Sequence, residues 1–270
     1  MDKLVFAFKK NPELYIGTFL SAVMIIIILA GVVLSPYDPE AMDAANKLAG
    51  PSAAHILGCD NFGRDIFARL SVGGATTLLV ALGTVAIGVF GGTIVGALTG
   101  YYGGAVDEVL MRFNDAVLAF PSILLALVFI SVFGSGTIKV IFALGIVFVP
   151  SFARIVRSEF MRCKNLDYVR SARLMGAGDL RIMFIHIFPN TIPVVLSSTV
   201  IGFNNAVLAE ASMSFLGIGV QPPESSLGRM LSDAQAFLFS NPSYAIYTGV
   251  TIALIVLGFS LLGDGLKKNA

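Results

Sequence analysis

The sequence predicts an all-α protein that crosses a membrane about six times. Of its 270 residues, 56% are hydrophobic and only 13% are charged, whereas a soluble domain usually carries about 25% charged residues. The charged residues are also unevenly placed, because long apolar stretches separate them. A soluble fold would expose too much apolar surface to water. The net charge of +1 gives no broad basic field that would attract nucleic acid.

Gaps between charged residues locate the predicted membrane helices, because a charge at the bilayer centre costs roughly 2.5–3.5 kcal/mol. One such gap runs from Arg69 to Asp107. The fourth span has the shortest apolar core and must extend past Arg154 into the interface, where a long basic side chain can reach water. Phe133 to Gly136 is the expected turn before it. The predicted spans are residues 15–34, 74–100, 116–134, 138–157, 190–214 and 244–263.

The placement of lysine and arginine predicts that both chain ends are cytoplasmic. The first apolar run, 15–34, is longer than the roughly 7–15 residues of a signal-peptide core. We therefore interpret it as a retained helix that follows a cytoplasmic tail, 1–14. Basic residues concentrate in this tail, in the loop 158–189 and in the C-terminal tail 264–270, as the positive-inside rule requires of cytoplasmic segments. The segments 35–73 and 215–243 are then expected outside, and the core transmembrane domain covers 74–263.

The second span has a glycine at every fourth position near its end, which places these residues on one helix face. Glycines let another backbone approach closely. The face predicts either a functional helix–helix seam or the ordinary packing of any membrane bundle. Pro121 is expected to kink the third span, because proline removes a backbone hydrogen bond. The glycines concerned are Gly88, Gly92, Gly96 and Gly100.

The loop 158–189 predicts two short helices joined by a glycine turn. Asn165 suits the N-cap of the first helix, and Gly176 suits the left-handed residue that ends it. Asp179 suits the cap of a second helix, which ends before Pro189. Small side chains around the turn would let a partner approach closely. The alternative is an ordinary amphipathic interfacial loop.

This stretch resembles the EAA loop of permease subunits from ATP-binding-cassette importers. That pattern is Glu-Ala-Ala, three residues, Gly, nine residues, Ile, one residue and Leu-Pro. Here Arg170, Ser171 and Ala172 occupy the triplet, Gly176 the glycine, and Phe188-Pro189 the end. The departures keep the small-residue-and-glycine architecture and argue against an acidic role in the triplet. They are Arg170 for Glu, Ser171 for the first Ala, His186 for Ile and Phe188 for Leu.

In that family the loop forms the coupling helix, which docks in a cleft of the ATPase subunit. The resemblance implies this role for Tyr168, Arg170, Ser171, Ala172, Gly176 and Ala177.

Other motifs are similar to the family branch of dipeptide, oligopeptide and nickel permeases. Residues 55–65 are similar to the signature HxLGTDxxGRD, with Cys59 in place of the usual Thr. The stretches 100–107, 115–122, 208–223 and 262–266 match as well, so the resemblance covers nearly the whole chain from about Tyr37. The branch resembled is the second, C-type permease. The signature residues that match are Gly58, Asp60, Gly63, Arg64 and Asp65.

The resemblance implies the type I ABC importer permease fold, in the cell membrane of a prokaryote. It implies a non-catalytic subunit that forms half of a translocation pathway. The implied partners are a B-type permease, two ATP-binding subunits, an extracytoplasmic substrate-binding protein and membrane lipid, with no nucleic acid. No cofactor is expected in this chain, because ATP and Mg would be bound by the partner subunits. Peptides are the preferred substrate, and nickel or a metal chelate is the alternative.

The signature segment also has two glycines five residues apart, as a phosphate-binding loop does. Arg64-Asp65 follows them instead of Lys-Ser/Thr, so nucleotide binding is excluded. Asp60, Arg64, Asp65 and Arg69 can pair locally. These pairs either order the segment or meet a partner subunit.

Glu210 lies near the outer end of the fifth span, and ionisable groups at membrane depth are usually functional or paired. Glu210 and Ser214 are therefore candidates for a pathway or gate. The two histidines fall on opposite sides of the membrane, and so do the two cysteines. Neither a His-based metal site nor a disulfide is then expected of His55, His186, Cys59 and Cys163.

The alternative from another class is an ion-coupled secondary transporter. Such proteins usually carry intramembrane charged relays and internal repeats, whereas the deep spans here are nearly free of charge and show no repeat. An intramembrane enzyme is a weaker alternative still, since neither HExxH nor GxSxG occurs in the sequence.

Overall fold

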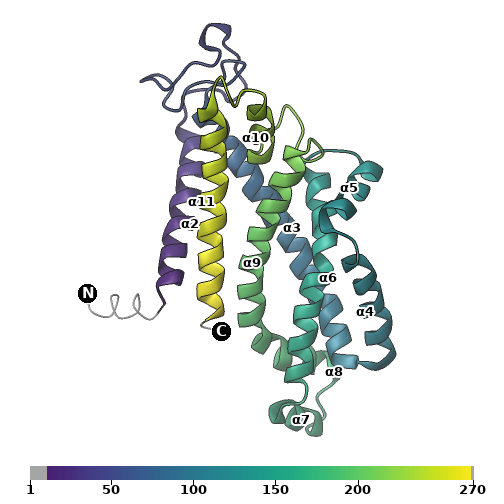
Figure 1. Cartoon of the computed structure of the whole chain (residues 1–270). Coiled ribbons are helices and arrows are strands. Elements are labelled where there is room, and N and C mark those ends of the chain that lie inside the picture. Colours follow the sequence, from purple (N-terminus) through teal and green to yellow (C-terminus); the bar gives the residue numbers. More distant parts are fainter. Residues whose placement is uncertain (1–10, 269–270) are drawn as a thin grey trace, which may run out of the picture.

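The computed structural model describes residues 11–268, which form a bundle of helices without a β-strand (Figure 1). Residues 1–10 of the predicted N-terminal tail and residues 269–270 of the C-terminal tail lie outside the described part. The elements are α2 (Pro12–Leu34), η1 (Ala44–Asn46), α3 (Ile66–Tyr102), α4 (Gly104–Leu118), α5 (Ser122–Phe133), α6 (Thr137–Cys163), α7 (Asp167–Leu174), α8 (Asp179–Arg181), the π-helical η2 (Ile182–Ile187), α9 (Phe188–Phe215), α10 (Leu227–Gln235) and α11 (Pro242–Lys267).

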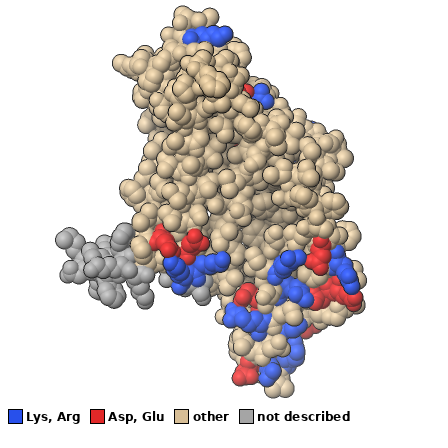
Figure 2. All heavy atoms as spheres, in the orientation of Figure 1, with Lys and Arg blue, Asp and Glu red and all other residues tan. Residues whose placement is uncertain are grey.

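Five helices in the described part are long and apolar enough to cross a membrane, and the number becomes six if the bent pair α4 and α5 counts as one span. The five are α2, α3, α6, the stretch from α8 through α9, and α11. Figure 2 shows a broad middle band with almost no charged side chain and a cluster of charged side chains at one end. The prediction of an all-α membrane protein with about six spans is confirmed.

The two ends of the bundle differ in content. One end, here called the hairpin end, holds α7 and α8, the start of α2 and the end of α11 (Figure 1). The opposite end holds the segment 35–65 and α10 (Figure 1). The start of α2 and the end of α11 therefore share one side of the bundle, as an even number of crossings requires.

The third predicted span, 116–134, is wrong as a single kinked helix. α4 and α5 meet at 91° across a short break. Pro121 stands in the break as the N-cap of α5, with an extended ψ of 126°. Proline has no N–H and disfavours the helical conformation in the residue before it. The chain therefore breaks here, where the sequence predicted only a bend.

The segment predicted as 35–73 ends at residue 65, because a side-chain cap starts α3 early. Asp65 Oδ1 accepts a hydrogen bond from the N–H of Ala68 (2.7 Å). This bond satisfies one of the free backbone donors at the helix start. α3 consequently extends over 37 residues, beyond the predicted 74–100.

α6 follows the predicted turn at 133–136. Gly134 (φ 86°) and Gly136 (φ 129°) take left-handed conformations there, which glycine adopts without a steric penalty. The helix then continues past Arg154 to Cys163. The loop predicted to begin at residue 158 therefore begins at residue 164.

α3 and α6 pack closely, and the regularly spaced glycines of α3 lie in their contact. A Cβ atom added at Gly92 would lie 2.4 Å from the Cβ of Phe152, and one added at Gly96 would lie 2.5 Å from the carbonyl oxygen of Ala153. The two backbones thus approach too closely for any side chain at these positions. The same contact includes Gly88 and Gly100.

A second close approach joins α2 to α11, which lie side by side (Figure 1). A Cβ atom added at Gly17 would lie 2.3 Å from the backbone nitrogen of Leu262. Asn11 Nδ2 donates a hydrogen bond to the carbonyl of Gly265 (2.8 Å), where the two helix ends meet. No motif in the sequence indicates this pairing.

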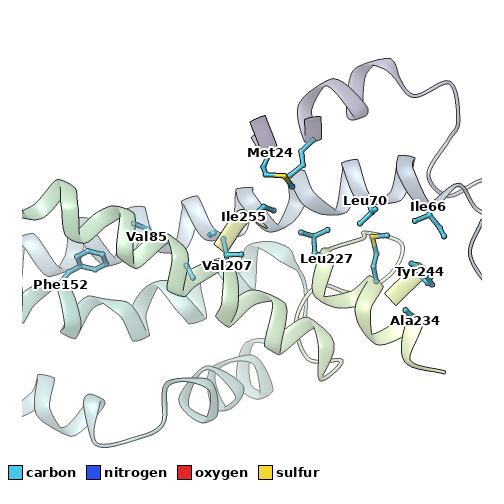
Figure 3. Packing of buried hydrophobic residues seen from close by; sticks show 14 residues of the cluster. Met24, Ile66, Leu70, Val85, Phe152, Val207, Leu227, Ala234, Tyr244 and Ile255 are labelled. Atoms are coloured by element: carbon cyan, nitrogen blue, oxygen red, sulfur yellow. The ribbon is translucent and has the colours of Figure 1, made fainter. Parts of the chain in front are cut away.

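The largest apolar cluster joins α2, α3, α6, α9, α10 and α11 and extends toward the opposite end (Figure 3). Met24 of α2 and Leu70 of α3 belong to it, as does the fully buried Tyr244 of α11. The cluster holds the short α10 against the long helices, so the opposite end is a packed part of the bundle.

Candidate functional site

The hairpin formed by residues 164–181 projects from the end of the bundle (Figure 1). The N-cap of α7 is Leu166, whereas the sequence predicted Asn165. The Asn165 side chain instead turns back and donates a hydrogen bond to the carbonyl of Met161 (3.1 Å). α7 turns Val169 inward, where it is 1% exposed, and leaves Arg170 on the surface.

Gly176 ends α7 in the predicted left-handed conformation, with φ 83°. Its N–H donates to the carbonyl of Arg173 (3.0 Å), and the N–H of Ala177 donates to the carbonyl of Ala172 (3.1 Å). These two bonds form the Schellman arrangement that closes many helices. No atom lies within 4 Å of a Cβ added at Gly176, so the turn is open to approach from outside.

The structure divides the candidate docking residues between the surface and the base of the hairpin. Tyr168, Arg170, Ser171 and Gly176 are exposed, Ala177 is half-buried and Ala172 is buried. The most exposed apolar side chains of the hairpin are two that the sequence analysis missed. Their exposure could have been predicted from their position directly before the glycine that ends α7, because few other residues are close enough to pack against the tip of a hairpin. They are Leu174 (89% exposed) and Met175 (81% exposed).

The base of the hairpin is anchored to several helices. Val169 joins a buried apolar cluster with residues of α3, α6, η2 and α9. Asn190 Nδ2 of α9 donates a hydrogen bond to the Tyr168 hydroxyl (3.3 Å). The N-cap of α8 is Gly178 rather than the predicted Asp179. The Asp179 carboxylate is turned toward α3 and is bonded to a tyrosine there.

At the opposite end, the fully buried carboxylate of Asp60 gathers several donors. It accepts hydrogen bonds from the N–H groups of Phe62 (2.8 Å) and Arg64 (3.0 Å) and from Arg64 Nε (2.7 Å). Arg69 Nε lies 3.5 Å from the same carboxylate, and Arg69 Nη2 lies 3.7 Å from Asp233 of α10. The charges therefore join the signature segment to α3 and α10.

The remaining signature residues also have local roles in this segment. Asp65 pairs with His55 (2.9 Å) and not with a neighbouring arginine. Gly58 and Gly63 both have φ 78°. Cys59 is fully buried and free. Burial, reinforced by the nearby carboxylates of Asp65, Asp60 and Asp43, raises the pKa of the Cys59 thiol.

A cleft of about 710 Å³ opens between the α4–α5 break, α6 and α9. Its walls are mostly apolar, with Phe148 and Phe152 from α6 and Val194 from α9. A row of uncharged polar side chains crosses it at intervals of seven residues, two helical turns, along one face of α9. This spacing was a readable signal that the sequence analysis did not use. The row consists of Ser198, Asn205 and Ser212.

Glu210 and Ser214, the candidates for a pathway or gate, do not line this cleft. Both are fully buried on another face of α9, and Ser214 Oγ donates a hydrogen bond to Glu210 Oε1 (2.6 Å). Ser214 Oγ also accepts the N–H of Val220 (3.0 Å). This position gives no support to a pathway role and ties α9 to the segment that follows it. Within residues 11–268, no cluster of three His, Cys, Asp or Glu side chains could hold a metal ion.

Long apolar helices, a middle band with almost no charged side chain and a cluster of charged side chains at one end define a multi-pass membrane protein. Residues 92–269 match the family described as binding-protein-dependent transport system inner membrane component. The chain belongs to this family, as the motifs predicted.

Curated relatives agree over nearly the whole chain. The dipeptide transport system permease protein DppC of Alkalihalophilus pseudofirmus is 37% identical over 259 residues, which is 96% of this chain and 85% of that protein. The glutathione transport system permease protein GsiD of Pectobacterium atrosepticum is 42% identical over 235 residues, which is 87% of this chain and 78% of that protein. The chain is thus related to transport permease subunits.

Two solved structures share the fold at low sequence identity. The inward-facing MetNI methionine ABC transporter matches with a TM-score of 0.62 and 18% identity, over 74% of this chain and 95% of that one. An amino acid ABC transporter with histidines matches with a TM-score of 0.56 and 19% identity, over 73% of this chain and 92% of that one. The importer permease fold that the resemblance implied is confirmed.

Proposed function

We propose that this chain is one permease subunit of an ATP-driven peptide importer and that it forms half of the translocation pathway. The named cargoes of its relatives, dipeptides and glutathione, are both peptides and support this substrate class. The neutral row on α9 supports it as well. Hydroxyl and amide groups can hydrogen-bond to the peptide backbone, which is the same in every cargo sequence.

Membership of a binding-protein-dependent family supports the expected partners. They are a substrate-binding protein outside the membrane, a B-type permease beside this chain, and two ATP-binding subunits that hold ATP and Mg. It also favours the importer over the ion-coupled secondary transporter.

The basic side chains support a cytoplasmic position for the hairpin end. Arg154, Arg157 and Arg162 lie in the last part of α6, and Arg170 lies on α7. The positive-inside rule places such clusters on the cytoplasmic side. The ATP-binding subunits would then meet the chain at this end.

The observation on which the coupling role depends is the shape of the 164–181 hairpin. Its base is buried, whereas Leu174 and Met175 at its tip are nearly fully exposed beside the open turn at Gly176. Exposed apolar side chains on a firmly held support are typical of a protein contact. We infer that this tip inserts into the ATP-binding subunit.

The test uses the assembled complex, purified through a tag on this chain. We expect Leu174→Asp and Met175→Asp to lower the recovery of ATP-binding subunits about tenfold, because a charge replaces an apolar anchor at the contact. The B-type permease should still copurify. ATP-dependent uptake of labelled alanyl-alanine and labelled glutathione into proteoliposomes should be lost.

Phe239→Asp is the matched control, because Phe239 is a fully exposed apolar residue in the turn between α10 and α11, away from the hairpin. It should leave the recovery of ATP-binding subunits unchanged. Full recovery with both tip variants would refute the coupling role. Uptake of labelled nickel by the wild-type complex, with neither peptide transported, would refute the substrate class.

A further inference from the structure

Tyr101 occupies a special position at the hairpin end of α3. Its side chain is only 7% exposed, although it lies in the last turn of the helix. Its neighbour Gly100 belongs to the close contact with α6, where an added Cβ would lie 2.6 Å from the Cβ of Phe160. Tyr101 therefore sits where the α3–α6 contact meets the 164–181 hairpin.

Tyr101 bonds to both arms of the hairpin. Its hydroxyl donates a hydrogen bond to Asp179 Oδ1 at the start of α8 (2.6 Å) and accepts one from Arg173 Nη2 at the end of α7 (3.2 Å). The Arg173 guanidinium also lies 5.9 Å from the centre of the Tyr101 ring. Lys164 Nζ donates to the Tyr101 carbonyl (3.4 Å). One residue thus contacts both ends of the glycine turn and the end of α6.

This linkage differs from the other attachments of the hairpin. Within residues 11–268, Tyr101 is the one residue of α3 that hydrogen-bonds to the hairpin. The bond between Asn190 and Tyr168 leads to α9 and joins exposed residues. The contacts of the apolar cluster at the base are non-directional, whereas charge-assisted hydrogen bonds fix the position of their partners.

We propose that Tyr101 is the positioning residue through which movement of the 164–181 hairpin reaches the α3–α6 pair. The proposal rests on the coupling role of the hairpin proposed above. When an ATP-binding subunit displaces the tip, Arg173 and Asp179 pull on the Tyr101 hydroxyl from the two sides of the turn. Because glycines lock α3 against α6 next to this point, both helices move with it.

The test is the ratio of uptake to ATP hydrolysis in the assembled complex, with labelled alanyl-alanine and labelled glutathione as probes. Tyr101→Phe keeps the ring and removes only the hydroxyl. We expect ATP-binding subunits to be recovered in full and uptake per ATP to fall about fivefold or more, at the lower end of usual coupling factors. Asp179→Ala should have the same effect, whereas Asp179→Asn, which keeps an acceptor oxygen, should restore most of the ratio.

Tyr102→Phe is the matched control. It is the same substitution one residue further on, at a half-exposed side chain whose hydroxyl has no hydrogen bond to the described residues. It should leave the ratio unchanged. An equal ratio for the Tyr101 and Tyr102 variants would overturn the proposal, as would a Tyr101 variant that loses the ATP-binding subunits. If Tyr101→Phe does not accumulate, the two variants of the exposed Asp179 decide, and equal ratios for them would also overturn it.

The two proposals fail in different ways. If the hairpin does not dock, the Leu174 and Met175 variants keep their ATP-binding subunits. If only the role of Tyr101 is wrong, those variants lose the subunits and Tyr101→Phe still transports at the wild-type ratio.

Discussion

The two ends of the bundle use charged side chains in opposite ways. At the end that holds the segment 35–65 and α10, Asp60 is fully buried and Arg69 is nearly so. Their contacts join this segment to α3 and α10. At the hairpin end, Asp167 and Arg170 are exposed and lie 3.6 Å apart on one helix. Buried charges fix a shape, because separating them leaves an uncompensated charge. Exposed charges add little stability and leave a surface free for a partner.

The largest change in stability that this comparison predicts is the loss caused by replacing Asp60. Asp60→Ala leaves Arg64 and Arg69 without their buried partner, and breaking such a pair costs roughly 3–5 kcal/mol. The measurement is thermal unfolding of the chain in detergent, followed by circular dichroism. Asp167→Ala removes the exposed carboxylate at the hairpin end and should leave the unfolding curve unchanged. Equal destabilisation by the two variants would break the comparison.

A smaller effect is expected where helices touch. Gly96→Ala places a Cβ 2.5 Å from the Ala153 carbonyl oxygen. Such overpacking typically costs about 1–3 kcal/mol. Gly178→Ala is the matched change in the hairpin. No atom lies within 4 Å of a Cβ added at Gly178, and its φ is −71°. The same unfolding measurement should separate the two variants, and a Gly96 variant as stable as the wild type would contradict the close contact.

The smallest effect leaves stability unchanged and concerns thiol reactivity. Cys59 and Cys163 are 0% and 1% exposed, and the pKa of Cys59 is raised, so its reactive thiolate is scarce at pH 7–8. A maleimide should label neither in the folded wild type and both after denaturation in SDS. Met175→Cys should add one thiol that reacts within minutes, and faster as the pH rises toward 8.5. Rapid labelling of Cys59 in the folded wild type would show that the opposite end is open.

Features that depend on local spacing could be predicted from the sequence. The gaps between charged residues located the long helices. The four-residue spacing of glycines marked the face of α3 that contacts α6, and Gly176 predicted the left-handed turn. Each of these rests on residues close together in the chain.

Features that depend on distant partners could not be predicted. Proline indicated a disturbance at residue 121, but its presence in the sequence does not give the 91° angle between α4 and α5. Asp179 suited a helix cap, yet its partner is a tyrosine 78 residues away. Likewise, nothing near Gly17 or Gly265 in the sequence indicates that α2 and α11 meet there. A single sequence read by itself contains little information on such pairs.

The length of α6 has a consequence for assembly in the membrane. Its 27 residues measure about 40 Å at 1.5 Å per residue, whereas the hydrocarbon layer is about 30 Å thick. Three arginines lie in its final ten residues, so the surplus of about 10 Å extends into water on that side. The helix thus holds the tip of the 164–181 hairpin clear of the lipid headgroups, so the ATP-binding subunit that we propose as its partner would bind there without displacing lipid.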